Sequence, residues 1–214
     1  MFGSGTDDFE DEREALAAQL SSRDGIQNEE TIDAVRSVLR HEFVPENRRR
    51  DAYADRPLPI GEGQTISAPH MVALMADLLD LESGDRVLEI GTGCGYHAAI
   101  TAELVGDENV YSVEYHDSLA DASRQRLAEL GYGDVSIRVG DGTNGWADHA
   151  PYDACYLTCA PSEFPDTIVE QLRPGGQLLA PLGTGTQRLV LAEKRDDGTL
   201  NRERHGRVRF VSMQ

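Results

Sequence analysis

The sequence predicts an α/β fold in which a doubly wound, mostly parallel sheet carries helices on both faces. Two observations support this prediction. From Asp85 onward, short runs rich in Val, Ile, Leu and Tyr alternate with segments of helical length, which is the pattern of parallel strands joined by crossover helices. The first run ends in a glycine-rich loop, Gly91-Thr92-Gly93-Cys94-Gly95, directly before a helical segment. That order is typical of a Rossmann-like fold, where such loops bind nucleotide cofactors.

Helices are also expected ahead of the alternating region. Acidic residues at 7–14 lead into an Ala- and Leu-rich stretch at 15–20, and acids stabilise the positive end of a helix dipole. A second helix is expected over residues 29–39, from the spacing of its apolar side chains. These two helices form a predicted N-terminal helical extension.

An irregular segment and a third helix should follow this extension. Prolines and glycines are dense between residues 43 and 63, which predicts loops and turns. The third helix should run through residues 71–78, with Ser67 as its candidate N-cap and Pro69 in its first turn.

The rest of the chain divides into ten predicted elements, seven strands and three helices. We expect strands at residues 86–90, 110–114, 135–139, 152–157 and 177–181. We expect helices at residues 96–105, 118–130 and 165–172. Two last strands, at 188–194 and 207–211 around the turn Asp196-Asp197-Gly198, are predicted to form an antiparallel C-terminal edge.

Charge excludes some classes of partner. The chain has 38 acidic and 20 basic residues, a net charge of −18, and Lys194 is its only lysine. Such a surface repels phosphate backbones, so we expect no nucleic-acid partner. Because salt screens self-repulsion, the composition also suggests a halophilic source. The three cysteines lack the double CxxC spacing of a metal site, and we expect free thiols and no metal.

Targeting signals are absent from the sequence. No apolar run reaches the roughly 18–20 residues that a membrane span needs. Residues 1–8 have neither the basic start nor the apolar core of a secretory signal. We therefore expect a cytoplasmic protein without a membrane partner, and a monomer.

The glycine loop favours S-adenosylmethionine over a dinucleotide. The dinucleotide fingerprint needs its third glycine three residues after the second, whereas Gly95 follows Gly93 by two. Glu89 lies two residues before Gly91. A carboxylate there would disfavour a pyrophosphate and favour a ligand with ammonium and sulfonium charges. Glu89, Gly91, Thr92, Gly93 and Gly95 are therefore predicted to bind the cofactor.

Acids at the ends of the next two strands extend this site. Glu114 ends the second strand about 20 residues after the loop, where a carboxylate can accept hydrogen bonds from ribose hydroxyls. Asp141 and Gly142 follow the third strand, and Asp141 is predicted to contact the adenine amino group. An ordinary Asp-Gly turn is the alternative at this position.

Several segments closely resemble the protein-L-isoaspartate O-methyltransferase family. The two longest are residues 55–71, DRPLPIGEGQTISAPHM, and residues 87–99, VLEIGTGCGYHAA. Shorter matches occur at 139–143, 172–176 and 187–191. The C-terminal residues 210–214, FVSMQ, depart from the Phe-Val-Pro-Leu that relatives usually carry.

The resemblance implies a division of the chain and a reaction. Residues 1–68 would form the helical extension and substrate loop, and residues 69–214 a compact S-adenosylmethionine-binding methyltransferase domain. A methyl group would pass from the cofactor to the free α-carboxylate of L-isoaspartyl residues in damaged peptides and proteins, which starts their repair. A carboxylate is ionised at neutral pH, so the reaction needs positioning and exclusion of water but no general base.

The same resemblance assigns the substrate residues. Gln64, Thr65, Ile66 and Ser67 would grip the isoaspartyl carboxylate, and Ser67 matches the family's active-site serine. We interpret Ser67 as an orienting group and not a nucleophile, because no Gly-x-Ser-x-Gly elbow surrounds it. Two alternatives stay open: a methyltransferase for another carboxylate or small molecule, and a catalytically inactive cofactor-binding homologue.

Overall fold

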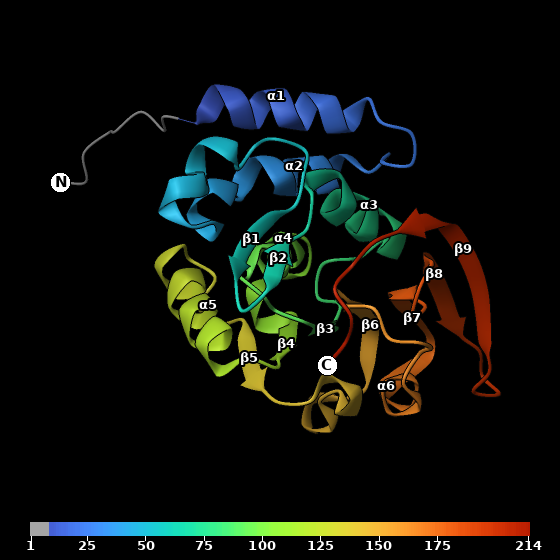
Figure 1. Ribbon diagram of the computed structural model, residues 1–214. Coiled ribbons are helices and arrows are strands. Elements are labelled where there is room, and N and C mark those ends of the chain that lie inside the picture. The colour runs from blue at the N-terminus through green and yellow to red at the C-terminus, as the bar shows by residue number, and fades with distance from the viewer. Residues whose placement is uncertain (1–8) are drawn as a thin grey trace.

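The computed structural model describes residues 9–214 and contains the predicted α/β fold (Figure 1). Its main sheet has seven strands in the order β5-β4-β3-β6-β7-β8-β9. The strands from β5 to β7 are parallel, and β8 and β9 add an antiparallel edge. The strand bounds are β3 Val87–Ile90, β4 Val110–Glu114, β5 Ser136–Val139, β6 Tyr152–Leu157, β7 Leu172–Leu182, β8 Gln187–Lys194 and β9 Leu200–Val208.

Helices cover both faces of this sheet. Alternate residues of β3 face two different core clusters: Val87 packs with the N-terminal helices, and Leu88 packs with Ile168 of α6. The helices are α1 Glu10–Ser21, α2 Glu29–Ser37, α3 Pro69–Leu79, α4 Tyr96–Val105, α5 Asp117–Glu129 and α6 Asp166–Gln171. The 3₁₀ helices are η1 Arg40–Phe43, η2 Glu46–Asp51, η3 Asp107–Asn109, η4 Gly142–Asn144 and η5 Ala147–His149.

The N-terminal extension packs into the main core. Leu16 and Leu20 of α1, and Val35 of α2, belong to the same buried cluster as Ile100 of α4. Glu10, Asp11 and Glu12 occupy the first turn of α1, as predicted, whereas Asp7 and Asp8 lie outside the described residues. The division of the chain after residue 68 stays a prediction. Within residues 9–214, none of the helices combines the length and the apolar character that crossing a membrane requires.

The structure corrects the prediction for the start of α3. The N-cap is Ala68 and not Ser67, and no side chain caps the helix. The carbonyl of Ala68 accepts the first helical hydrogen bond, from the amide of Val72. The carbonyl of Ser67, one residue earlier, accepts instead from the side chain of Arg40. Pro69 is in the first turn, as predicted.

Other corrections concern element ends. Helix α2 ends at Ser37, because Val38 is extended with φ −80° and ψ 120°. The predicted irregular segment contains a hairpin of β1 Leu58–Gly61 and β2 Gln64–Ile66. The last strand is β9, Leu200–Val208, so the predicted bounds of 207–211 are wrong: the strand begins at Leu200, and residues 209–211 lie outside it. Its pairing with β8 is set by the turn near Gly198, which starts the ladder at Lys194 and Leu200.

Candidate active site

The glycine loop joins β3 to α4, as predicted. Gly91, Gly93 and Gly95 have φ values of 97°, 55° and 90°, a left-handed conformation that favours glycine. A Cβ atom on Gly91 would lie 2.3 Å from the Thr158 hydroxyl oxygen. The loop therefore presents bare backbone to the space above the carboxyl ends of the strands.

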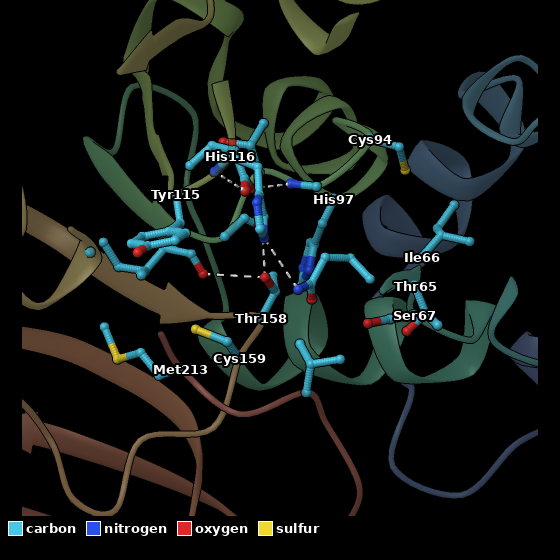
Figure 2. Close-up of a pocket in the computed structure, with 18 of the residues that line it drawn as sticks. Thr65, Ile66, Ser67, Cys94, His97, Tyr115, His116, Thr158, Cys159 and Met213 are labelled. Atoms are coloured by element: carbon cyan, nitrogen blue, oxygen red, sulfur yellow. Dashed lines mark hydrogen bonds between the residues drawn. The ribbon is translucent and has the colours of Figure 1, made fainter. Parts of the chain in front are cut away.

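One pocket lies beside this loop (Figure 2). Its walls come from the glycine loop, the β1–β2 hairpin with residue 67, the ends of β3, β4 and β6, and residues 211–214. The predicted site residues that it brings together are Gln64, Thr65, Ile66, Ser67, Gly91, Thr92, Gly93, Glu114 and Gly142. Those that do not line it are Glu89, Gly95 and Asp141.

Glu114 fastens the glycine loop to the end of β4. Its Oε2 accepts a hydrogen bond of 2.8 Å from the Gly93 amide, and its Oε1 accepts one of 3.0 Å from the His116 amide. The residue is only 4% exposed yet lines the pocket. Glu114 therefore lies in the pocket at the end of β4, where the sequence predicted a carboxylate. Its contact with the ribose stays a prediction.

Glu89 lies beneath the loop and is fully buried. Its carboxyl group accepts hydrogen bonds from Ser112 Oγ at 2.5 Å and from the Tyr156 hydroxyl at 3.0 Å. Burial raises the pKa of Glu89 to about 8, and the charge of Glu114 also raises it. The carboxyl group is therefore neutral at pH 7 in the free protein. Burial thus disfavours the ionised form that the charge argument assumed, and both the charge argument and a cofactor role for Glu89 stay predictions.

Asp141 is exposed and turned toward its own backbone. Its Oδ1 accepts from the Thr143 amide at 2.8 Å and from the Thr143 hydroxyl at 2.6 Å. Those two hydrogen bonds lower the pKa of Asp141. Gly142 lines the pocket, and a Cβ atom there would lie 2.4 Å from Ile90 Cγ2. The adenine contact predicted for Asp141 remains untested.

Several lining residues were missed by the sequence reasoning. Tyr115 and His116 directly follow Glu114, and His97 is two residues beyond Gly95, so proximity to the motifs could have indicated them. Within residues 9–214, neither ring nitrogen of the buried His97 has a hydrogen-bond partner, and its ring stacks on Tyr156 with centroids 4.3 Å apart. The remaining missed residues are Val72, Ile90, Cys94, Tyr96, Val113, Thr158, Cys159, Val211, Ser212, Met213 and Gln214.

The C-terminal segment reaches the pocket by pairing beside the end of β6. Ala160 donates to the Val211 carbonyl at 2.8 Å, and Met213 donates back to the Ala160 carbonyl at 3.0 Å. Met213 and Cys159 therefore appear on the same side of the pocket in Figure 2. No local sequence signal connects residues 160 and 212, so only the folded chain reveals this wall.

The sequence matches one protein family over nearly its full length. Residues 11–214 match the family described as protein-L-isoaspartate(D-aspartate) O-methyltransferase. The chain belongs to this family. The resemblance seen at residues 55–71 and 87–99 is thereby confirmed, and the chain is a methyltransferase.

Curated relatives of this methyltransferase carry the family's name. Protein-L-isoaspartate O-methyltransferase 2 of Archaeoglobus fulgidus is 48% identical, over 97% of this chain and 94% of the relative. Protein-L-isoaspartate O-methyltransferase 1 of the same organism is 50% identical, over 96% of this chain and 94% of the relative. Protein-L-isoaspartate O-methyltransferase of Methanopyrus kandleri is 48% identical, over 96% of this chain and 92% of the relative.

Solved structures agree with this assignment. A protein-L-isoaspartate O-methyltransferase superposes with a TM-score of 0.84 and 31% identity, covering 94% of this chain and 65% of that one. This methyltransferase thus spans about two thirds of the length of that solved relative. A structure from Plasmodium falciparum, described as a putative protein-L-isoaspartate O-methyltransferase in complex with S-adenosyl-L-homocysteine, superposes with a TM-score of 0.82 and 25% identity. The match covers 94% of this chain and 98% of that one. S-adenosylmethionine is therefore the cofactor, as the glycine spacing predicted.

Proposed function

We propose that this methyltransferase binds S-adenosylmethionine on the glycine loop and methylates the free α-carboxylate of L-isoaspartyl residues held at residues 64–67. One observation carries the proposal. A single pocket contains both the glycine loop after β3 and the β1–β2 hairpin with Ser67, which are separate in the sequence. Cofactor and acceptor can therefore meet in one cavity.

The residues of the pocket suit the cofactor. The bare backbone of Gly91 and Gly93 allows close approach, and Glu114 offers carboxylate oxygens at the end of β4. Tyr115, 55% exposed, gives an aromatic face beside it that can stack on a purine. S-adenosylmethionine supplies an electrophilic methyl group on a sulfonium when it is bound. We assign Glu114 to the ribose and Tyr115 to the adenine.

The acceptor side of the pocket offers hydroxyl and amide groups. Among the described residues that line the pocket there is no Lys or Arg, so we assign direct contact with the acceptor carboxylate to neutral donors. Thr65 and Ser67 provide hydroxyl groups and backbone amides at this edge (Figure 2). We assign these groups to orienting the isoaspartyl carboxylate in line with the methyl carbon. An ionised carboxylate needs no base, so positioning and exclusion of water account for the catalysis.

Methyl transfer to matched peptides tests this function. The protein is incubated in molar KCl with labelled cofactor and two peptides that differ only in an isoaspartyl or an aspartyl linkage. We expect label on the isoaspartyl peptide alone. Equal labelling of both peptides contradicts the proposed substrate, and binding of cofactor without any transfer indicates an inactive homologue.

A variant connects this activity to the assigned loop. Ser67→Ala removes one hydroxyl from the acceptor side but leaves the glycine loop intact. We expect at least about a tenfold loss in kcat/KM for the isoaspartyl peptide, the effect of one hydrogen bond to a charged group. The affinity for S-adenosylhomocysteine should stay within twofold, and a loss of both would refute the assignment.

The physiological setting of the enzyme is also part of the proposal. We infer that the methyl ester initiates repair of damaged proteins and that the enzyme works as a cytoplasmic monomer. The net charge of −18 favours a halophilic source and disfavours nucleic acid as a partner. Gel filtration with light scattering in molar KCl tests the monomer, and a dimer mass would contradict it.

A further inference from the structure

Arg40 is a fully buried cation behind the acceptor side of the pocket. Its Nε donates to the Ala52 carbonyl at 2.8 Å, and its Nη2 donates to the Ser67 carbonyl at 2.7 Å. The guanidinium lies over the ring of Tyr96, 4.6 Å from the centroid. Ser67 and Tyr96 both line the pocket, whereas Arg40 does not. One buried side chain therefore joins two walls of the site.

Packing alone does not explain an arginine at this place. Burial lowers the pKa of Arg40, which means that the surroundings disfavour its charge. A buried charge is costly, and an apolar side chain of similar size often serves a core equally well or better. Within residues 9–214, its Nη1 forms no hydrogen bond of good geometry, and the adjacent Tyr96 side chain favours the charged form of Arg40. The site therefore retains a charge whose burial is costly, although hydrogen bonds and the Tyr96 ring offset part of that cost. This suggests a use for the charge outside packing.

The nearby acidic side chain does not neutralise Arg40 by direct pairing. Asp55 favours the charged form of Arg40 through its electrostatic field. The Asp55 carboxylate, however, accepts hydrogen bonds from the amide and ring of His70 and forms an ion pair with Arg23 at 3.0 Å. Positive potential from Arg40 thus remains available to the adjoining pocket.

The chemistry of the acceptor gives this potential a role. The proposed acceptor is a carboxylate, and the described lining of the pocket contains Glu114 but no Lys or Arg. Charges interact more strongly across buried, low-dielectric regions than across water. We propose that Arg40 is a positioning residue for methyl transfer, which fixes the Ser67 carbonyl and attracts the acceptor carboxylate through the wall of the pocket. This inference rests on the proposed isoaspartyl acceptor.

Two substitutions separate the charge from the hydrogen bond. Arg40→Lys keeps the charge but loses the planar fork, and Arg40→Gln keeps an N–H donor but loses the charge. Arg36→Gln is the matched control, since it removes the same charge from an exposed position on α2 where Arg36 pairs with Asp33 and Glu14. Each protein is assayed for KM and kcat with the isoaspartyl peptide, and for S-adenosylhomocysteine affinity by calorimetry.

We expect the Arg40 substitutions to weaken binding of the acceptor peptide and to leave binding of the cofactor unchanged. Arg40→Gln should raise the peptide KM at least about tenfold, and Arg40→Lys about threefold, with cofactor affinity within twofold of wild type in both. Arg36→Gln should match wild type. A folded Arg40→Gln variant with wild-type peptide KM overturns the proposal, and so does an equal loss of peptide and cofactor affinity. If Arg40→Gln does not fold, an unchanged peptide KM in Arg40→Lys overturns it.

Hydrogen exchange provides a readout that does not depend on turnover. With the Ser67 carbonyl released, amides of residues 64–68 should exchange at least about tenfold faster in Arg40→Lys, whereas amides of α5 should not change. Unchanged exchange at residues 64–68 overturns the positioning role. Lack of transfer by the wild-type protein refutes the proposed function instead, so the two failures are distinguishable.

Discussion

Glu89 and His97 both contact Tyr156, and burial shifts their proton affinities in opposite directions. The Tyr156 hydroxyl donates to Glu89, and the His97 ring stacks on the Tyr156 ring. Burial raises the pKa of Glu89 to about 8 and lowers the pKa of His97 to about 3. Each group is therefore neutral at pH 7, because a charged form would lose its hydration in the interior.

These two shifts give the fold a defined pH dependence. Between pH 4.5 and 8 the folded chain keeps a proton on Glu89 that the unfolded chain has lost, so stability falls as pH rises. Between pH 3 and 6.5 the unfolded chain protonates His97 and the folded chain does not, so stability rises with pH. The two slopes oppose each other between pH 4.5 and 6.5, and between pH 6.5 and about 8 only the slope from Glu89 remains.

Glu89→Gln tests this account at the residue scale. Between pH 6.5 and about 8, wild type should lose roughly 1 kcal/mol of unfolding free energy per pH unit from this group. The variant should lack that decline. Urea unfolding at pH 6.5 and 7.5 measures both, and equal declines in the two proteins would show that Glu89 is ionised in the folded state.

The glycine loop is the element on which the cofactor site depends. Gly91 has φ 97°, and an added Cβ would meet the Thr158 hydroxyl, which itself donates to the Gly91 carbonyl at 2.6 Å. Gly185 lies in a β7–β8 connection with no positive φ and no atom within 4 Å of an added Cβ. The pair therefore contrasts a constrained glycine with an unconstrained one.

Gly91→Ala should weaken both the fold and the site. We expect about 1–3 kcal/mol of destabilisation from the strained backbone and at least about a tenfold loss of S-adenosylhomocysteine affinity. Gly185→Ala should change neither by more than about 0.5 kcal/mol. Thermal unfolding and calorimetry measure these effects, and a Gly91→Ala protein that binds like wild type would refute the close-approach role.

The only lysine of the chain, Lys194, donates to three backbone carbonyls at once. Its Nζ donates to the carbonyls of Val169 at 2.8 Å, Glu170 at 3.3 Å and Leu172 at 2.7 Å, at the end of α6. A compact ammonium group has three donors that can diverge toward three acceptors, whereas a planar guanidinium cannot match them. The side chain therefore caps α6 from the neighbouring strand β8.

Lys194→Met should destabilise the protein by about 1–3 kcal/mol, because partly buried carbonyls lose a charged donor. Arg195→Gln is the control, since it removes the same charge from the adjacent residue, whose side chain donates to Asn201 Oδ1 at 3.4 Å. Urea unfolding compares the two. Equal stability of both variants would mean that Lys194 contributes only its charge.

At the scale of the whole molecule, the excess of acid dominates. Thirty-eight acidic residues against 20 basic ones repel one another across a small domain, and salt screens this repulsion. We expect the melting temperature to rise steadily from 0.1 to 2 M KCl. Sucrose at matched viscosity serves as the control for effects unrelated to charge. A melting temperature that is flat or falls with KCl would contradict the halophilic interpretation.

The sequence by itself determined the order of strands and helices from β3 onward, the position of the glycine loop, the cofactor and the family. These features depend on local patterns: hydrophobic period, glycine spacing and the motif at residues 55–71. The α4 and β4 bounds were predicted to the residue for the same reason. Local patterns also misled, since Ser67 resembled an N-cap and the cap is Ala68.

Only the tertiary structure decided what surrounds the motifs. Sheet order brings residues 211–214 beside the end of β6 and into the pocket, although nothing near them in the sequence indicates it. Burial neutralises Glu89, and the fold places Arg40 against the Ser67 carbonyl, 27 residues away. Proton affinity and long-range contacts depend on packing between distant segments, and a linear pattern carries no information about the distance between them.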